Sequence, residues 1–168
     1  MRYLLVISAI LFSFSLQASL NLAYVDMQKA LQATKAGKQA KASLEKEFKK
    51  KEAEFKRKDA ELKKMGEDIQ KKAVAWSEDQ KRKKTIEFQQ KRFALQQEVA
   101  RSQQQISVKE RELTIPIFKG LRDEVAKLAK EKKYSMVLEK SEQSVLYAEK
   151  KLDITDEVVK RFEKNSKK

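Results

Sequence analysis

The chain has 168 residues, with 39 Lys or Arg against 25 Asp or Glu, which gives a formal net charge of +14. It contains neither histidine nor cysteine, and this excludes the usual metal ligands, thiol nucleophiles, disulfides and the commonest general base. Its three glycines are far apart, so no glycine-rich phosphate loop is present. Composition leaves a Ser/Lys or paired-carboxylate enzyme open, but every Ser, Asp and Glu is also explained as a helix cap or a solvated charge. We therefore expect no catalysis, no cofactor and no metal.

Residues 1–18 have the pattern of a secretory signal peptide. Arg2 supplies the positive start, and the apolar stretch that follows is shorter than the roughly 20 residues that span a bilayer. Gln17-Ala18-Ser19 fits a cleavage site, whereas Leu16 stands where a small residue is preferred, which leaves an uncleaved anchor as the alternative. The mature chain is predicted to begin near Ser19 with a net charge of +13. Without cysteine it has no thiol for lipid attachment.

A short strand and a short helix are predicted directly after the leader. Residues 20–25 are apolar, and Asp26 is placed to cap a brief helix over residues 27–33. Together they form the first part of a predicted body, residues 19–35.

The middle of the chain is predicted to be a long charged helical segment. Residues 38–115 contain one glycine and no proline, and they carry 22 basic and 14 acidic residues. The apolar residues form only a thin stripe, too narrow to bury the surface that an independent core needs. We therefore expect residues 36–116 to project from the body as an arm.

Large apolar side chains recur every seven residues through the first half of this arm. They are Phe48, Phe55, Leu62, Ile69 and Trp76. This period is typical of a coiled coil, but the second core position holds Glu45, Glu52 and Asp59, so we expect a marginally stable, flexible pairing. At about 1.5 Å per residue the outbound helix reaches roughly 60 Å, and Gly66 marks a candidate bend.

The arm is predicted to turn back as a hairpin near residues 75–78. Ser77 and Gln80 fit a capping box, in which each side chain satisfies a backbone N–H of the new helix. The return half carries a similar apolar stripe: Ile86, Phe93, Leu95, Val99, Ile106, Leu113 and Ile117. The seam between the two helices is assigned to Phe48, Phe55, Leu62, Ile69, Phe93, Val99 and Ile106. Pro116, with Gly120 just beyond, predicts a kink near the base or a restart of the helix there.

The far end of the chain is predicted to complete the body, residues 117–168. Residues 134–138 and 144–147 look like two strands joined by a polar turn, and Thr155 opens a closing helix with acidic residues in its first turn. Three short strands and two short helices give a marginal core, so we expect copies of the chain to complete the sheet. The residues assigned to core or oligomer contact are Leu22, Tyr24, Val25, Val137, Leu138 and Leu146. The expected fold class is α+β, mostly α, with a small β-rich trimerisation body and a long helical coiled-coil hairpin.

Several segments, taken in order, closely resemble the Skp/OmpH family of periplasmic chaperones. They are Ala23-Tyr24-Val25-Asp26-Met27-Gln28-Lys29, Lys35-Ala36-Gly37-Lys38, Pro116-Ile117, Tyr134-Ser135-Met136-Val137-Leu138 and Leu152-Asp153-Ile154-Thr155-Asp156-Glu157-Val158. The resemblance covers essentially the whole chain, the leader included. It implies a homotrimer in the Gram-negative periplasm, with a body of β-strands from three subunits. It also implies three arms that enclose a cavity for unfolded outer-membrane proteins, without nucleotide. Binding of lipopolysaccharide is a further role that the resemblance suggests, and no residues are assigned to it.

The end of the arm holds the candidate client-binding residues. They are Lys71, Lys72, Val74, Trp76, Lys81, Arg82, Lys83 and Lys84, and against them stand only Glu78 and Asp79. The cationic side chains are explained either as a solvated face or as contacts to acidic clients or anionic lipid. Trp76 with Val74 is explained equally as a local hydrophobic latch or as a client or membrane contact.

Three function classes remain. The favoured one is an ATP-independent holdase that keeps unfolded outer-membrane proteins from aggregating before membrane insertion. The alternatives are a peripheral binder of anionic membrane or lipopolysaccharide, and a structural coiled coil or basic nucleic-acid binder. The leader and the lack of aromatic residues placed for base stacking among the lysines argue against specific nucleic-acid binding.

Overall fold

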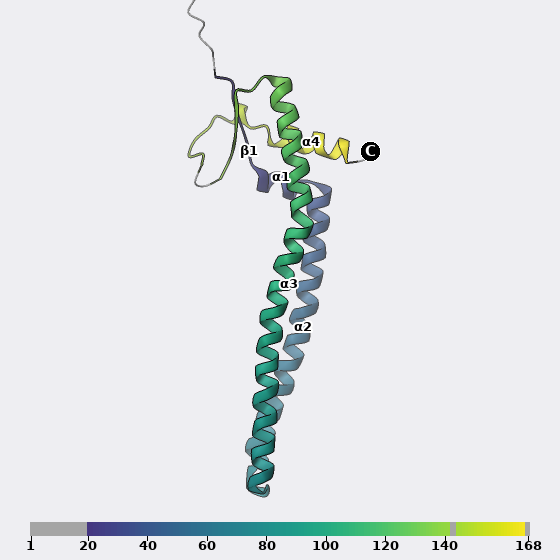
Figure 1. Ribbon diagram of the computed structural model, residues 1–168, viewed down its shortest axis with the longest axis vertical. Helices are drawn as coiled ribbons and strands as arrows, with labels where there is room; N and C mark the ends of the chain where they lie inside the picture. The colour runs from purple at the N-terminus through teal and green to yellow at the C-terminus, as the bar shows by residue number, and fades with distance from the viewer. Residues whose placement is uncertain (1–19, 142–143, 167–168) are drawn as a thin grey trace, which may run out of the picture.

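The computed structural model describes residues 20–141 and 144–166, and the predicted signal peptide lies outside them (Figure 1). A long hairpin of two helices projects from a small body at one end of the molecule (Figure 1). The elements are β1 (Leu22–Val25), α1 (Met27–Ala33), α2 (Lys35–Lys72), η1 (Ala73–Ala75), α3 (Glu78–Lys132), β2 (Met136–Glu139), η2 (Lys150–Leu152) and α4 (Thr155–Asn165). The predicted fold class, α+β and mostly helical with a protruding arm, is confirmed.

The arm consists of α2 and α3, which run antiparallel and are joined by η1 at the far end (Figure 1). The capping box predicted at the start of α3 is confirmed: Gln80 N donates to Ser77 Oγ at 3.3 Å, and Ser77 N donates to Gln80 Oε1 at 3.1 Å. α3 then continues through Pro116 to Lys132, so the predicted restart of the helix at the proline does not occur. The proline removes one backbone donor, and a helix of 55 residues can tolerate the loss of that one hydrogen bond.

The core lies in the body, where β1 is enclosed by helices. β1 and β2 pair in parallel, from Leu22 opposite Met136 to Val25 opposite Glu139. Parallel neighbours need a long crossover connection, and here the crossover is the entire arm. The buried apolar side chains come from β1, from α1, from the first turns of α2, from the body end of α3 and from the start of α4: Ala23, Val25, Met27, Ala30, Ala40, Ile117, Leu121, Leu128, Ile154 and Val158.

One predicted strand is absent. Residues 144–147 are not a strand in the described chain, and Leu146 and Tyr147 are 96% and 85% exposed. A strand needs a neighbour to satisfy its backbone, but β1 pairs with β2 on one side and bridges to Asp153 on the other. Both sides of β1 are thus occupied. The outer side of β2 is open, but residues 144–147 do not pair with it in the described chain, and Leu146 is no part of the monomer core.

The junction between α1 and α2 directs the arm away from the body. Thr34 is fully buried and caps α2, since Gly37 N donates to its Oγ1 at 2.9 Å. Gly37 is obligatory here because a Cβ would lie 1.9 Å from the carbonyl oxygen of Leu31. The predicted cap at Asp26 is confirmed by a 2.7 Å bond from Lys29 N.

α4 closes the body against the base of α3. Thr155 begins the helix as predicted, but its hydroxyl accepts a bond from Asp26 N at 2.9 Å, and Asp153 Oδ1 receives the Thr155 N–H instead. On the α3 side, the absence of a side chain at Gly120 makes room for the Phe162 ring, which a Cβ would approach to 2.6 Å. These contacts anchor the base from which the arm extends.

Candidate functional site

The far end of the arm is a cationic turn. Three of its basic residues pair with acidic neighbours on their own helix: Lys72 with Asp68 at 3.7 Å, Lys81 with Glu78 at 2.7 Å and Lys84 with Glu87 at 3.1 Å. Within the described residues, no ion pair is formed by the other three, Lys71, Arg82 and Lys83. The tip thus carries uncompensated positive charge that is available to a partner.

The two apolar residues predicted at the tip differ in their surroundings. Val74 lies in η1 and is 95% exposed, which leaves it free to meet another molecule. Trp76 is half-buried and lines a groove between α2 and α3. Its indole therefore has both a packed side, as a latch has, and an open side.

The groove beside Trp76 extends along the distal part of the arm and has a volume of about 650 Å³. Its apolar lining comes from Leu62, Met65, Ile69 and Leu95, all of them half-buried. Charged side chains of both signs border it: Lys58, Glu61, Lys64, Asp68, Lys72, Lys84, Glu87, Lys91 and Glu98. An amphipathic surface of this kind offers apolar contact together with charge and has no enclosed pocket.

The distal seam contains one aromatic residue that the sequence pattern missed. Phe88 of α3 is half-buried and packs toward Gly66, where a Cβ would lie 3.5 Å from its ring. The seven-residue series Phe88, Leu95, Ser102 and Lys109 marks this inner face of α3, and all four side chains are half-buried or buried. The signal was hidden because polar residues occupy two of the four positions.

The predicted seam is wrong at two aromatic positions. Phe48 is 57% exposed and Phe93 is 61% exposed. The heptad period gives the spacing but not which of two neighbouring residues faces the partner helix. Near Phe48 the inward position is taken by Glu47, whose carboxylate accepts a hydrogen bond from Lys109 of α3. The other assigned residues, Phe55, Leu62, Ile69, Val99 and Ile106, are half-buried.

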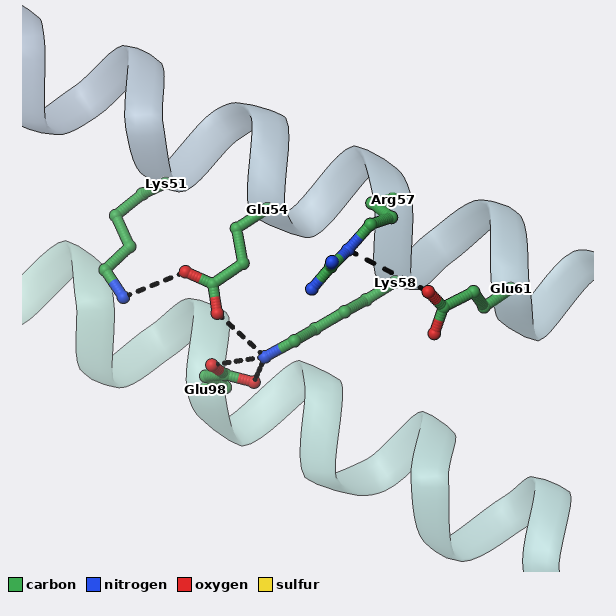
Figure 2. A network of polar contacts seen from close by, with 6 residues as sticks. All are labelled: Lys51, Glu54, Arg57, Lys58, Glu61 and Glu98. Atoms are coloured by element: carbon green, nitrogen blue, oxygen red, sulfur yellow. Dashed lines mark hydrogen bonds and ion pairs between the residues drawn. The ribbon is translucent and has the colours of Figure 1, made fainter.

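Ion pairs join the two helices in the middle of the arm (Figure 2). Lys58 of α2 donates to both carboxylate oxygens of Glu98 in α3 at 2.6 Å. Glu54 lies 3.0 Å from Lys58 and 3.2 Å from Lys51, so the network runs along α2 before it crosses to α3 (Figure 2). A second crossing joins Lys109 to Glu47.

These contacts favour the charged forms of the side chains that make them. Hydrogen bonds from Lys58 and Lys51 lower the pKa of Glu54 from its usual 4.5 to about 2. The hydrogen bond from Lys109 likewise lowers the pKa of Glu47, and that to Glu98 raises the pKa of Lys58. Glu47, Glu54 and Lys58 are therefore held in their charged forms at neutral pH.

The body carries a second exposed apolar surface. Of the six residues assigned to it, Tyr24 and Val25 are buried, Leu22 and Val137 are half-buried, and Leu138 and Leu146 are exposed. Met136 of β2 is 52% exposed and lines a shallow groove with Val125, Ala129 and Tyr134. This surface adjoins the side of β2 that no strand of the described chain covers.

Two kinds of site were not found in residues 20–141 and 144–166. No cluster of three or more carboxylates is placed to hold a metal ion. None of the helices is sufficiently apolar over its length to cross a bilayer.

Comparison with known proteins gives one family and one fold. Residues 21–162 match the family described as outer membrane protein (OmpH-like). A solved structure from Caulobacter crescentus CB15, described as a proposed outer membrane chaperone (OmpH-like), is similar with a TM-score of 0.73 at 19% identity. The match covers 86% of this chain and 85% of that one. At this identity the likeness establishes the fold. No curated protein matches the sequence.

Proposed function

Because the chain belongs to the OmpH-like family, we propose that it is an ATP-independent periplasmic chaperone that holds unfolded outer-membrane β-barrel proteins. The observation that carries the proposal is the arm, a long cationic hairpin whose apolar residues stay half-buried along an open groove. Such a surface offers contact to an unfolded chain without fixing one ligand shape. A chaperone role also agrees with the description of the similar solved structure.

The chaperone is proposed to act as a homotrimer. The open side of β2, with Met136 and Leu138 exposed, and the exposed Leu146 and Tyr147 supply an apolar surface that further copies would cover. Three mature chains of +13 each carry +39. Arms that extend from one trimeric body would enclose a positively charged cavity that attracts acidic clients.

Weak, numerous contacts suit this task. An unfolded β-barrel exposes alternating apolar residues, and many individually weak contacts add to a useful avidity while each stays reversible. Release then needs no nucleotide, because a client that folds into the membrane leaves the unfolded pool and mass action empties the chaperone.

Complex formation provides the direct test. The mature chain is mixed with a urea-unfolded outer-membrane β-barrel protein, and mass is measured by light scattering after size exclusion. A soluble complex of one client with three chaperone chains supports the proposal. A monomeric chaperone that never co-elutes with client contradicts it.

A second candidate function is peripheral binding to anionic membrane or lipopolysaccharide. It is favoured by Val74, which is almost fully exposed in the same turn that carries Lys71, Arg82 and Lys83, three cations that form no ion pair with any described residue. Co-sedimentation with anionic but not neutral vesicles, lost on Val74→Asp, would support it. Equal sedimentation of the Val74→Asp variant would contradict a membrane role for the tip.

A further inference from the structure

We propose that the groove between α2 and α3 binds one extended segment of a client, so that a single arm recognises a client by itself. This inference rests on the proposed function and places a specific site within each arm, distinct from a cavity between arms. The ligand is an extended peptide in which apolar residues alternate with polar or acidic ones.

The ends of the groove fix the length of its ligand. The Lys58–Glu98 ion pair borders it toward the body, and Trp76 borders it at the tip. Trp76 lies 18 positions after Lys58, across the last turns of α2 and η1, which corresponds to about 27 Å at the rise of an α-helix. An extended strand rises about 3.3 Å per residue, so roughly eight residues would fill this length.

The lining suits an alternating strand. Leu62, Met65 and Ile69 follow one another at helical spacing along the groove, about 5 Å apart on average. Successive side chains on one face of a strand are about 7 Å apart, and the flexible thioether of Met65 can adjust to that mismatch. Since all three side chains are half-buried, covering them would remove apolar surface from water without unfolding the arm.

The positive charge near the groove favours acidic residues on the outward face of the bound peptide. Within the lining, Lys64 forms no ion pair with any described residue. Lys71, Arg82 and Lys83 do not line the groove, but they belong to the turn at its Trp76 end, and they too form no ion pair with the described residues. Carboxylates at the outward positions of a bound strand would lie near these cations, whereas basic side chains would be repelled.

The single tryptophan of the chain makes the site directly measurable. Trp76 is the only tryptophan and is half-exposed in the groove. The probe is a synthetic peptide of about eight residues that alternates Leu or Val with Asp or Ser and has no aromatic residue. Titration of the mature full chain with this peptide is expected to shift Trp76 emission to shorter wavelength in a saturable way.

Ala94 supplies the variant that separates the groove from its surroundings. Its side chain lines the groove yet is exposed, so Ala94→Glu adds a carboxylate there without removing a packed side chain. We expect this substitution to weaken binding of the peptide about tenfold. Ala100→Glu is the matched control, because Ala100 is also exposed on α3 but lies outside the groove; circular dichroism confirms that both variants keep their helices.

The outcomes are distinct. A saturable shift that Ala94→Glu weakens and Ala100→Glu preserves supports the site. It is overturned by an unchanged emission, by equal weakening in the two variants, or by an equal shift with a peptide of the same composition whose apolar residues are grouped. A shift with anionic vesicles and none with either peptide would assign the groove to lipid and also overturn it. Failure of the chain to prevent client aggregation would contradict the proposed function, which this titration does not use as its readout.

Discussion

Lys58 of α2 and Glu98 of α3 join the two helices of the arm through a pair of 2.6 Å hydrogen bonds. The bonds lie in the part of the seam where Glu47, Glu54 and Lys51 replace apolar side chains. An apolar stripe alone tolerates sliding of one helix against the other, whereas a charge pair is satisfied in one register. The pair therefore specifies the alignment of the hairpin.

Charge reversal tests that alignment. Lys58→Glu and Glu98→Lys should each lower the midpoint of thermal unfolding, because like charges would then face each other across the seam. The double reversal should recover most of the loss. Circular dichroism at 222 nm measures the midpoints. Glu61→Lys is the control, since among the described residues Glu61 forms an ion pair only with Arg57 of its own helix, at 3.8 Å. A double variant no better than either single one would refute register specification by this pair.

Acid should loosen the middle of the arm. The folded-state pKa of Glu54 is depressed from 4.5 to about 2, so its stabilising effect is complete above pH 4.5 and is lost as the pH falls from there toward 2. The protection of amides 47–58 against hydrogen exchange, taken relative to the intrinsic exchange rate at each pH, should fall over that window. Glu54→Gln should flatten this dependence, while Glu61→Gln should retain it. Protection factors that stay constant across the window would contradict the assignment.

Two glycines of α2 should respond in opposite ways to alanine. Gly37→Ala should destabilise the chain by more than about 2 kcal/mol, because its Cβ would overlap the Leu31 carbonyl at 1.9 Å. Gly66→Ala should stabilise it by about 0.5–1 kcal/mol, because the new Cβ would make only an ordinary contact with Phe88 at 3.5 Å. Urea unfolding gives both values. Destabilisation by Gly66→Ala would show that the position needs glycine for a bend.

Features that depend on neighbours in the sequence could be predicted from it. The capping box at Ser77 and Gln80 is such a case, because its hydrogen bonds join residues three apart. The alternation of helix and strand, and the hairpin itself, follow from glycine, proline and apolar spacing. The pairing of β1 with β2 across the arm brings together residues more than 110 positions apart, and nothing in the local sequence indicated which strands pair.

Features that depend on a partner element could not be predicted. Phe48 satisfies the heptad period, yet the inward position belongs to Glu47 because Lys109 of α3 faces it. Residues 144–147 have the composition of a strand but pair with no strand of the described chain, although the outer side of β2 is open. The groove arises from two helices in a particular register, which no periodicity within either helix contains.

The tip should accelerate capture of acidic clients. Reversing Lys71, Arg82 and Lys83 to Glu should slow association with an acidic unfolded client about tenfold at low salt and little at high salt, because screening removes the difference. Stopped-flow fluorescence measures the rate. The control reverses three exposed lysines of the body and its base, Lys119, Lys130 and Lys160. Equal slowing in both triple variants would mean that total charge, and not the tip, governs capture.

The exposed loop of the body should be needed for assembly. Leu146→Asp should shift the chain from trimer to monomer without lowering the stability of the monomer core, because Leu146 is 96% exposed. Sedimentation velocity measures the state of assembly. Phe48→Asp, at an exposed position on the arm, should remain trimeric. A Leu146→Asp variant that stays fully trimeric would remove this loop from the proposed interface.

The central claim is tested most directly by light scattering as an unfolded outer-membrane β-barrel protein is diluted from urea beside the mature chain, beginning at Ser19, without ATP. Holding of clients on cationic arms predicts suppression of aggregation at no more than equal trimer, with weaker suppression at high salt. Aggregation that proceeds undiminished at excess chaperone and low salt would contradict the holdase function.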